Sequence, residues 1–390
     1  MGEHPKGLAG LPLLDDLGEL RGRRVLVRVD FNVPLERTGD GWRVADDYRI
    51  RASLPTLEWL VARGADVVCC THLGRPSGPD DGGCQLAPVR AALEALCPGV
   101  DMLENLRFDP GEPGNHPGFV DRLVEGFDAY VNDAFSVAHR AHASVVGPPT
   151  RLPSAAGLRL AQEVEVLTDL VASPVRPFVA VLGGAKVADK LGAVAAVARV
   201  ADVVLVGGGM AFTFLAAQGR RVGGSLLDAT RLEECRAVLA ASGHVELPSD
   251  VVALSPGAAY GPGETGGEVA TFDGDLPDGW IGLDVGEATA AAFAKELAGA
   301  ATILWNGPMG AFEDARFARG TDAVARATAA SRAFSVVGGG DSERAVAASG
   351  LAEDVSFIST GGGAMLALLE HGDLPGLAAL RAAPNARGRR

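Results

Sequence analysis

Lysine is almost missing from this chain. Of its 35 basic residues only four are lysine (Lys6, Lys186, Lys190 and Lys295), and the other 31 are arginine. Two of the four lie together, four residues apart, directly after an apolar run and a Gly-Gly turn. A lysine ammonium is a compact point charge, whereas guanidinium is a flat fork that needs more room. A lysine pair in an otherwise arginine-rich chain therefore indicates a phosphate site at this turn.

Long apolar runs, cysteine pairs and an excess of positive charge are also lacking. No apolar run reaches the ~18 residues that span a bilayer, and the first 16 residues lack the basic-then-apolar pattern of a secretory signal. The five cysteines form no C-x-x-C motif, which argues against a zinc site or a disulfide scaffold and fits a reducing compartment. The net charge of −14 argues against nucleic-acid or membrane partners. We therefore expect a cytoplasmic protein, although a local basic cluster could still bind a small anion.

The second half of the chain repeats one unit, in which a β-branched apolar run is followed by a glycine-rich turn and a helix-like stretch. Such alternation predicts a parallel sheet covered on both faces, with ligands at the carboxyl ends of the strands, where these turns lie. The expected strands are Phe178 to Leu182, Asp202 to Val206, Thr302 to Trp305, Phe334 to Val337 and Val355 to Ile358. The turns that follow are Gly183-Gly184, Gly207 to Gly209, Asn306 to Pro308, Gly338 to Gly340 and Ser359 to Gly363.

The first half has the same pattern, with polar and basic residues at the strand ends. The expected strands are Arg24 to Val29, Asp66 to Cys70 and Ala129 to Val131, and a helix is expected from Tyr48 to Arg63. At 390 residues the chain is long enough for about two domains. The predicted fold is α/β, with two similar domains, each a parallel sheet with helices on both faces. The stretch Ala155 to Ala172 is interpreted as the helix that connects them.

The glycine turns and the lysine pair predict nucleotide binding, because backbone amides without a Cβ can approach an anion closely. Neither the P-loop pattern nor G-x-G-x-x-G is present. Asp341 follows three glycines, where a carboxylate can hold Mg²⁺ against phosphate oxygens. The alternative is a helix cap, with Asp341 or Ser342 accepting amide hydrogen bonds. Beside the other turns, the Mg²⁺ interpretation is favoured.

Basic residues recur at the strand ends of the first half. Any single arginine is more typical of a solvated surface, but repeated placement near Asp30 and Asn32 favours a small, multiply anionic substrate. No nucleophile motif is present, so the two halves together suggest direct in-line phosphoryl transfer. The basic residues are Arg49, His72, Arg75, Arg107, His139 and Arg140.

Ten ordered segments, between about residues 13 and 380, resemble the motifs of phosphoglycerate kinases. These segments are Arg28 to Pro34, Thr71 to Pro76, Leu103 to Phe108, Asn132 to Phe135, Ala138 to Ser144, Leu182 to Lys190, Gly207 to Phe214, Trp305 to Glu313, Gly338 to Ser342 and Ser359 to Ala364.

The resemblance implies a role for each matching residue. The ligands of 3-phosphoglycerate would be Asp30, Phe31, Asn32, Arg49, His72, Leu73, Gly74, Arg75, Arg107 and Arg140. The nucleotide would be bound by Lys190, Gly208, Gly209, Glu313, Gly339, Gly340, Asp341 and Ser342, with Asp341 also on Mg²⁺. The catalytic residues would be Arg49, Lys186, Gly361, Gly362 and Gly363, with Lys186 following the transferred phosphoryl group.

The resemblance also implies reversible, Mg²⁺-dependent transfer between ATP and 3-phosphoglycerate in glycolysis and gluconeogenesis by a monomer. The nucleophile in the ATP-consuming direction is an ionised carboxylate, which needs no general base. Residues 1–172, completed by 372–390, would bind 3-phosphoglycerate, residues 173–371 would bind the nucleotide, and a hinge at the connecting helix would close them. Three positions depart from the family pattern, namely Thr71, Ser136 and Glu287, and Ser136 could alter the loop near Arg140.

Two other classes remain open on the residues alone. A dinucleotide-dependent dehydrogenase also uses parallel sheets with glycine turns, but the missing G-x-G-x-x-G counts against it. A non-catalytic anion-binding protein would not need two lysines and a Mg²⁺-type aspartate. If Lys186 follows a moving group while Lys190 holds the nucleotide, Lys186→Arg is expected to be the more damaging of the two arginine substitutions.

Overall fold

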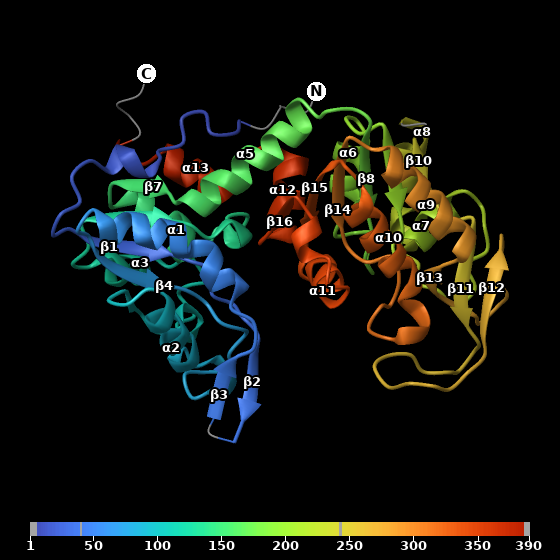
Figure 1. The fold of residues 1–390 in the computed structure, drawn as a ribbon, viewed down its shortest axis with the longest axis horizontal. Helices are drawn as coiled ribbons and strands as arrows, with labels where there is room; N and C mark the ends of the chain where they lie inside the picture. Colours follow the sequence, from blue (N-terminus) through green and yellow to red (C-terminus); the bar gives the residue numbers. More distant parts are fainter. Residues whose placement is uncertain (1–5, 40, 242–243, 386–390) are drawn as a thin grey trace. The chain divides into compact units, whose positions relative to one another are not determined.

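The computed structural model describes residues 6–39, 41–241 and 244–385, and these form two compact units (Figure 1). Unit 1 contains residues up to Thr168 together with the chain from His371 onward, and unit 2 runs from Asp169 to Glu370. The ends of the predicted segments 1–172 and 372–390, namely residues 1–5 and 386–390, lie outside the described residues. No helix among the described residues is long and apolar enough to cross a membrane.

Unit 1 is built on a five-stranded parallel sheet with the order β5-β4-β1-β6-β7. A separate hairpin, β2 and β3, follows the first strand. The strands are β1 (Arg24–Arg28), β2 (Leu35–Thr38), β3 (Gly41–Val44), β4 (Asp66–Cys70), β5 (Asp101–Met102), β6 (Ala129–Asn132) and β7 (Ser154–Ala156). The central strands are buried on both faces, as continuous apolar runs require.

Helices cover both faces of this sheet. Val25, Val67 and Val131 share one core with the apolar side chains of α1 and α2. On the opposite face the hydroxyl of Tyr130 donates to the carbonyl of Ser144 in α4 at 2.6 Å. The helices of unit 1 are α1 (Tyr48–Ala62), α2 (Ala87–Leu96), α3 (Pro117–Val124), α4 (Ala143–Val146) and α13 (Pro375–Arg381). The helix predicted from residue 48 is confirmed.

The connecting helix is shorter than predicted. Helix α5 spans Leu158–Ala172, whereas Ala155 and Ala156 belong to strand β7, which pairs with β6. Small residues are compatible with either state, so pairing with a neighbouring strand decided their conformation. The chain passes from unit 1 to unit 2 within α5.

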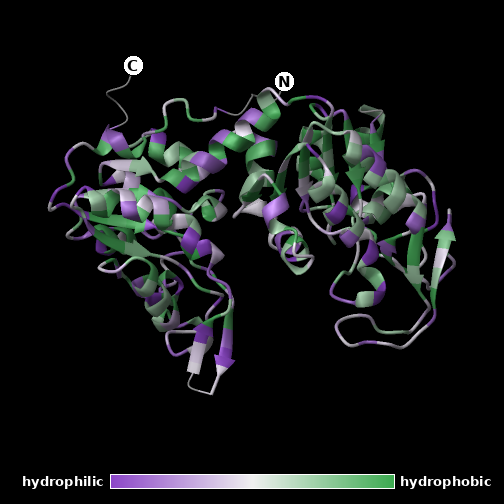
Figure 2. Cartoon of the chain, in the orientation of Figure 1, coloured by the Kyte–Doolittle hydropathy of each residue, from purple (hydrophilic) through white to green (hydrophobic). Residues whose placement is uncertain are grey.

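Unit 2 is built on a six-stranded parallel sheet with the order β10-β9-β8-β14-β15-β16. Its strands are β8 (Phe178–Leu182), β9 (Val203–Val206), β10 (Val245–Glu246), β14 (Thr302–Asn306), β15 (Phe334–Gly338) and β16 (Phe357–Ser359), which confirms the five predicted strands within two residues at their ends. Figure 2 shows the strands of both parallel sheets coloured as hydrophobic. The predicted α/β class, with a parallel sheet in each of two units, is therefore confirmed.

Helices also cover both faces of the second sheet. Side chains of α9, α10 and α11 share a core with Val181, Ile303 and Val337. On the other face Met365 of α12 packs against Gly338. The helices of unit 2 are α6 (Leu191–Val197), α7 (Ala211–Ala217), α8 (Leu232–Ala241), α9 (Glu287–Gly299), α10 (Arg319–Ala330), α11 (Gly340–Ala348) and α12 (Gly362–His371).

The sequence reasoning missed a small antiparallel sheet in unit 2. Its order is β12-β11-β13, with strands β11 (Asp250–Leu254), β12 (Val269–Asp273) and β13 (Ile281–Val285). No residue of β12 is buried, so this strand has no continuous apolar run to mark it. This sheet nevertheless contributes residues to the candidate nucleotide pocket.

Candidate active-site halves

Asp30 is the centre of the polar cluster in unit 1. It follows β1 and is nearly buried, and its carboxylate pairs with the guanidinium of Arg49 from the first turn of α1. The hydroxyl of Ser136 donates to the same carboxylate at 2.5 Å. Burial alone would raise the pKa of Asp30, but Arg49 and the other donors outweigh it and lower the pKa. Asp30 therefore stays ionised and fixes Arg49 in position.

Gly74 links three of the predicted ligands through its backbone. Its amide donates to Oδ1 of Asn32 at 2.8 Å, and its carbonyl accepts from Nη1 of Arg107 at 2.5 Å. Burial, Arg140 and Arg28 lower the pKa of Arg107, so these guanidinium groups lie close enough to repel one another. Such crowding of like charge is favourable only when an anion binds, which is the chemistry predicted for this edge of the sheet.

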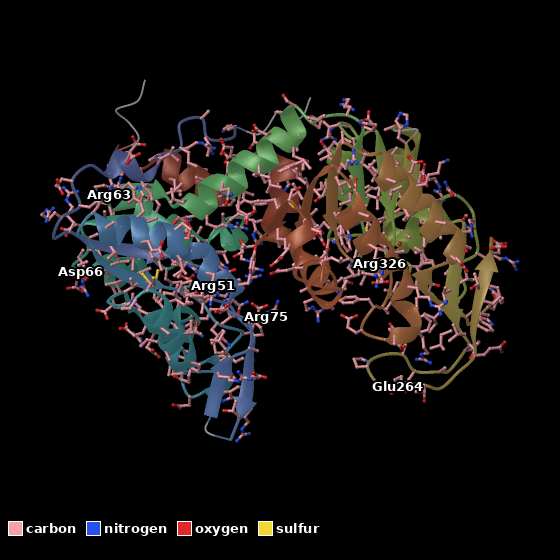
Figure 3. All side chains as sticks on the ribbon, viewed as in Figure 1. Arg51, Arg63, Asp66, Arg75, Glu264 and Arg326 are labelled. Atoms are coloured by element: carbon pink, nitrogen blue, oxygen red, sulfur yellow. The ribbon has the colours of Figure 1, made fainter. Side chains whose placement is uncertain are left out.

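The remaining predicted ligands of unit 1 differ in how they can act. Arg75, labelled in Figure 3, and Arg140 are exposed and can reach a ligand, and Nε of Arg140 donates to Nε2 of His139 at 3.3 Å. Phe31 and Leu73 have side chains in the apolar core. Only their backbone groups remain for binding, and the amide of Phe31 already donates to Oγ1 of Thr71 at 2.9 Å.

Arg28 is a member of this cluster to which the sequence reasoning gave no role. It is fully buried at the end of β1, and its guanidinium lies 3.2 Å from Nδ1 of His72. The sequence contained a signal for it, because a strand that ends in arginine among four apolar residues must bury a charge.

In unit 2, Lys190 is enclosed by oxygen atoms. Its Nζ donates to the carbonyl of Gly183 at 2.6 Å, to Oδ1 of Asn306 at 2.6 Å and to the carbonyl of Asn306 at 3.2 Å. Burial lowers the pKa of Lys190 to about 8, which the nearby Asp341 opposes. All three N–H bonds of the ammonium therefore hold the ends of β8 and β14, and a phosphate would have to share one of them.

Lys186 has the opposite environment. It is exposed, it lies in the turn between β8 and α6, and the described part of the chain offers it no hydrogen-bond or ion-pair partner. With Leu227 and Asp228 it lines a small pocket of about 140 Å³. The lysine pair thus consists of one fixed ammonium and one free ammonium.

A pocket of about 250 Å³ lies at the glycine turns of unit 2. Four of the predicted nucleotide residues line it, namely Gly208, Gly209, Glu313 and Asp341, together with Gly184 of the first glycine turn. Gly208 has a φ of +67°, and a Cβ there would lie 2.6 Å from the amide nitrogen of Gly184. The turns at Gly184 and Gly208 can therefore pack against each other only because position 208 is glycine.

The apolar wall of this pocket was missed by the sequence reasoning. Leu226 and Tyr260 are exposed large side chains, and Ile281 and Leu283 come from the overlooked antiparallel sheet. Apolar walls of this kind accept the flat faces of a nucleobase. They follow none of the strand-end glycine turns of the parallel sheet, so that pattern did not mark them.

Asp341 lies in the first turn of α11, next to Ser342. No side chain caps this helix, so the capping alternative for either residue is wrong. Instead the hydroxyl of Ser342 accepts from the amide of Gly307 at 2.6 Å. Asp341 accepts from Arg344 at 2.7 Å, and the same guanidinium nitrogen donates to Glu313 at 3.1 Å. Arg344, which the sequence reasoning did not name, thus joins two predicted nucleotide ligands.

The last glycine turn begins α12. A Cβ at Gly362 would lie 2.3 Å from the Cα of Gly339, so the turns at Gly339 and at Gly361 to Gly363 are packed against each other. Both turns present backbone amides at the start of a helix of nine or ten residues, where partial positive charge accumulates.

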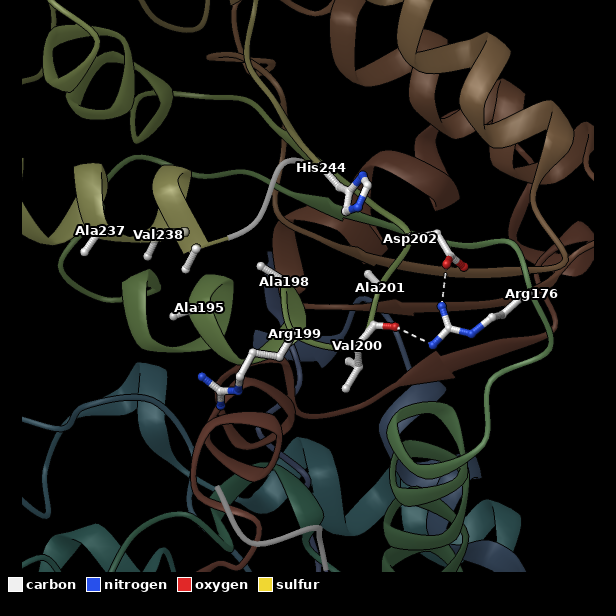
Figure 4. A pocket seen from close by; sticks show the side chains of 11 residues that line it. Arg176, Ala195, Ala198, Arg199, Val200, Ala201, Asp202, Ala237, Val238 and His244 are labelled. Atoms are coloured by element: carbon white, nitrogen blue, oxygen red, sulfur yellow. Dashed lines mark hydrogen bonds and ion pairs between the residues drawn. The ribbon is translucent and has the colours of Figure 1, made fainter. Parts of the chain in front are cut away.

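Another pocket of unit 2, larger than the one at the glycine turns, lies elsewhere. Its volume is about 760 Å³, and it lies at the amino ends of the strands, lined by residues of α6, of α8 and of the loops before β8, β9 and β10 (Figure 4). Its Arg176 is already paired with Asp202 and bonded to the carbonyl of Val200. None of the predicted site residues lines it, so its size does not make it the active site.

A family model described as "Phosphoglycerate kinase" matches residues 14–102 and 98–372. The chain belongs to the phosphoglycerate kinase family. Phosphoglycerate kinases of Frankia alni and Rubrobacter xylanophilus are each 49% identical to it, over 94% and 93% of this chain and 99% and 96% of theirs. The structure of phosphoglycerate kinase from Coxiella burnetii matches with a TM-score of 0.81 and 34% identity, over 95% of this chain and 98% of that one.

The three departures from the phosphoglycerate kinase pattern have simple structural consequences. Thr71 uses its hydroxyl to accept from Phe31 and to donate to the carbonyl of His72, which a serine would also do. Glu287 begins α9, where the helix dipole stabilises a carboxylate. Ser136 adds the hydrogen bond to Asp30 that a glycine would lack.

Proposed function

We propose that this protein catalyses the reversible transfer of a phosphoryl group between ATP and 3-phosphoglycerate. Membership of the phosphoglycerate kinase family supports this activity, together with one observation in the structure. Unit 1 gathers unneutralised guanidinium groups around Asp30, whereas unit 2 gathers glycine amides and lysines beside an apolar pocket. The first half-site suits a small polyanion, and the second suits a nucleotide.

In unit 1, each charged group has a distinct task in this proposal. Arg75 and Arg140 are exposed and bind the anionic groups of 3-phosphoglycerate, while Asp30 and Asn32 accept from its hydroxyl or position the loop around it. Arg49, held by Asp30, directs positive charge toward the carboxylate that attacks. This carboxylate is already ionised at neutral pH, so the reaction needs no general base.

In unit 2, the glycine turns bind the phosphates of ATP and Lys186 stabilises the transferred group. Glu313 accepts hydrogen bonds from the ribose hydroxyls, and Tyr260 with Leu226 contacts the base. The amides at Gly361 to Gly363 donate to the oxygens of the phosphoryl group in transfer. Because the donors are fixed before the reaction, little reorganisation is needed in the transition state.

The residues of unit 2 fit a magnesium ion that arrives with the nucleotide. No group of three or more His, Cys, Asp or Glu side chains able to hold a metal occurs among the described residues. One carboxylate, Asp341, borders the pocket, and Mg²⁺ commonly binds one or two carboxylates together with phosphate oxygens and waters. When bound, the ion would neutralise charge on the phosphates, and Asp341 would hold it there.

In-line transfer requires that the two half-sites meet, and they belong to different units. The chain crosses between the units in α5 and again near His371, and we propose that these connections serve as the hinge. A closed state would also exclude water and so limit hydrolysis of ATP. A cytoplasmic monomer remains our prediction, and the five free cysteines fit the reducing compartment.

A coupled assay tests the proposed function. The protein is mixed with ATP and 3-phosphoglycerate, and formation of the acyl phosphate is followed by NADH oxidation through an added dehydrogenase. We expect turnover only with both substrates and Mg²⁺. NADH oxidation without the added dehydrogenase would favour the dehydrogenase alternative, and no turnover would favour a binding protein without catalysis.

Replacing Arg140 with alanine should raise the KM for 3-phosphoglycerate at least about tenfold, because a charge-assisted hydrogen bond to the substrate is lost. The KM for ATP should change by less than about twofold, since Arg140 lies in unit 1. Arg151→Ala is the control, because Arg151 is also an exposed arginine of unit 1 but pairs with Asp121. A defect confined to ATP kinetics would contradict the assignment of Arg140.

Replacing Arg344 with alanine should tighten the binding of Mg²⁺-ATP about two- to fivefold, because Asp341 and Glu313 no longer have to leave an ion pair. The measurement is a calorimetric titration of the protein with ATP at several Mg²⁺ concentrations. Arg326→Ala is the control, since it removes an exposed ion pair of α10 that touches no site residue. Weaker binding in Arg344→Ala would mean that Arg344 itself contacts the phosphates.

A further inference from the structure

Arg28 is a buried arginine without a carboxylate partner at ion-pair distance among the described residues. Its side chain is inaccessible to solvent, and each part of its guanidinium has an uncharged acceptor. Nε donates to Oγ of Ser144 at 2.9 Å, Nη1 donates to the carbonyl of Val29, and Nη2 lies 3.2 Å from Nδ1 of His72. The hydroxyl of Ser144 in turn donates to Glu112 at 2.7 Å, so a carboxylate balances the charge only through this hydroxyl.

The contact with His72 has only one chemically sensible direction. A guanidinium carries five N–H donors and no acceptor, so Nη2 of Arg28 must donate and Nδ1 of His72 must accept. A nitrogen that accepts cannot carry a proton. In a neutral imidazole the proton is then on the other nitrogen, Nε2.

We propose that Arg28 is a positioning residue that holds His72 as the neutral Nε2–H tautomer, so that His72 offers an uncharged hydrogen-bond donor to the anionic substrate. This role rests on the function proposed above. The binding site already contains several arginines, and an imidazolium among them would add a further buried charge. A neutral N–H supplies a directed hydrogen bond without that cost.

The charged groups around His72 decide whether its imidazole is protonated or neutral. Asp30 has Oδ1 3.9 Å from Nδ1 and would favour a protonated imidazole, whereas Arg28, Arg107 and Arg49 oppose it. Burial together with these arginines lowers the pKa of His72 to about 3, although Asp30 acts against them. Arg28 makes the shorter contact to Nδ1. Nδ1 therefore accepts from Arg28 and carries no proton that it could donate to Asp30.

The second ring nitrogen is left for a ligand. The described residues provide no hydrogen-bond partner for Nε2 of His72, although only 5% of the residue is exposed. Nε2 is also not among the fully enclosed polar atoms that lack a partner, so it reaches the solvent side of the cluster. A donor in this position, beside Asn32 and Arg107, belongs to the same strand-end cluster as the predicted substrate ligands.

Nuclear magnetic resonance of the wild-type protein tests the tautomer directly. The chain has seven histidines, so the protein is labelled with ¹⁵N-histidine and the His72 signals are assigned by their loss in His72→Gln. We expect an unprotonated Nδ1 and a protonated Nε2 that do not change between about pH 5 and 8, the range in which an ordinary histidine titrates. An imidazolium signal, or a proton on Nδ1, would overturn the proposal.

Arg28→Met then tests whether Arg28 is the cause. Without the donor, Nδ1 should become protonated beside Asp30, and His72 should titrate within the accessible pH range. Ser144→Ala is the control, because it removes the partner of Nε and its hydrogen bond to Glu112 but keeps the contact of Nη2 with Nδ1, and it should leave the tautomer of His72 unchanged. Unchanged signals in a folded Arg28→Met protein would contradict the role of Arg28. If that variant does not fold, the wild-type spectrum still decides the tautomer.

A pair of substitutions at His72 provides a kinetic readout. The amide of glutamine can place an N–H near the position of Nε2, whereas the shorter asparagine places it near Nδ1. His72→Gln should therefore keep a KM for 3-phosphoglycerate at least about fivefold lower than that of His72→Asn. Equal KM values would contradict a donor at Nε2. The spectra need no activity, so failure of this inference is separate from failure of the coupled assay.

Discussion

Replacing Lys186 with alanine should lower kcat by about two to three orders of magnitude, because a positive charge that stabilises the transition state is lost. The KM for ATP should change by less than about twofold if, as proposed, Lys186 follows the phosphoryl group instead of anchoring the nucleotide. Stability should not change, since Lys186 is exposed and the described residues offer it no partner. Steady-state kinetics and thermal unfolding measure both effects.

The chain supplies a matched control for this substitution. Lys295 is also an exposed lysine of unit 2, in α9, and Lys295→Ala should leave kcat unchanged. Lys186→Arg should also reduce kcat, by at least about tenfold. A planar guanidinium cannot follow the small phosphoryl group as a compact ammonium does. An unaltered kcat in Lys186→Ala would refute the role assigned to this lysine.

Replacing Lys190 should destabilise unit 2 as well as weaken ATP binding. Lys190→Met would leave three oxygens of Gly183 and Asn306 without their donor, and we expect the free energy of unfolding to fall by at least about 3 kcal/mol. Denaturant unfolding and ATP titration measure the two losses. A fully stable variant with normal ATP affinity would contradict this role for Lys190.

The structure changes the expectation for Lys190→Arg. From the sequence alone, arginine should be tolerated better at position 190 than at 186. However, Nζ of Lys190 lies only 2.5 Å from where a Cβ at Gly307 would be, and two of its acceptors are at 2.6 Å. A guanidinium does not fit in this space. We therefore expect Lys190→Arg to unfold more easily than the wild-type protein, whereas Lys186→Arg should lose only kcat.

The architecture was predictable where the chain carries a local pattern. A continuous apolar strand followed by a glycine turn is unambiguous, and this pattern located β8, β9, β14, β15 and β16. The antiparallel strands β11 to β13 were missed because β12 has no buried residue. The start of the connecting helix was wrong because Ala155 and Ala156 obtain their conformation from pairing with β6.

The site was predictable in composition but not in its contacts. Residue type and position at strand ends, together with the family resemblance, selected Asp30, Arg49, Lys190 and Asp341. They did not reveal that Arg344 pairs with two nucleotide-side carboxylates, or that Ser136 donates to Asp30. Each of these contacts joins residues that are distant in the chain or follows from the direction of a long side chain. A linear pattern contains neither kind of information.

The sequence by itself determined the two parallel sheets, and it predicted a polyanion site on one, a nucleotide site on the other and a functional lysine pair. The family resemblance already implied different roles for the two lysines, but only the tertiary structure decided how their surroundings differ. Strands β8 and β14 end side by side although more than a hundred residues separate them, and there Gly183 and Asn306 surround Lys190 with oxygens. No such atoms surround Lys186 among the described residues. Because three acceptors fix one ammonium and none fixes the other, only Lys186 is free to move with a phosphoryl group.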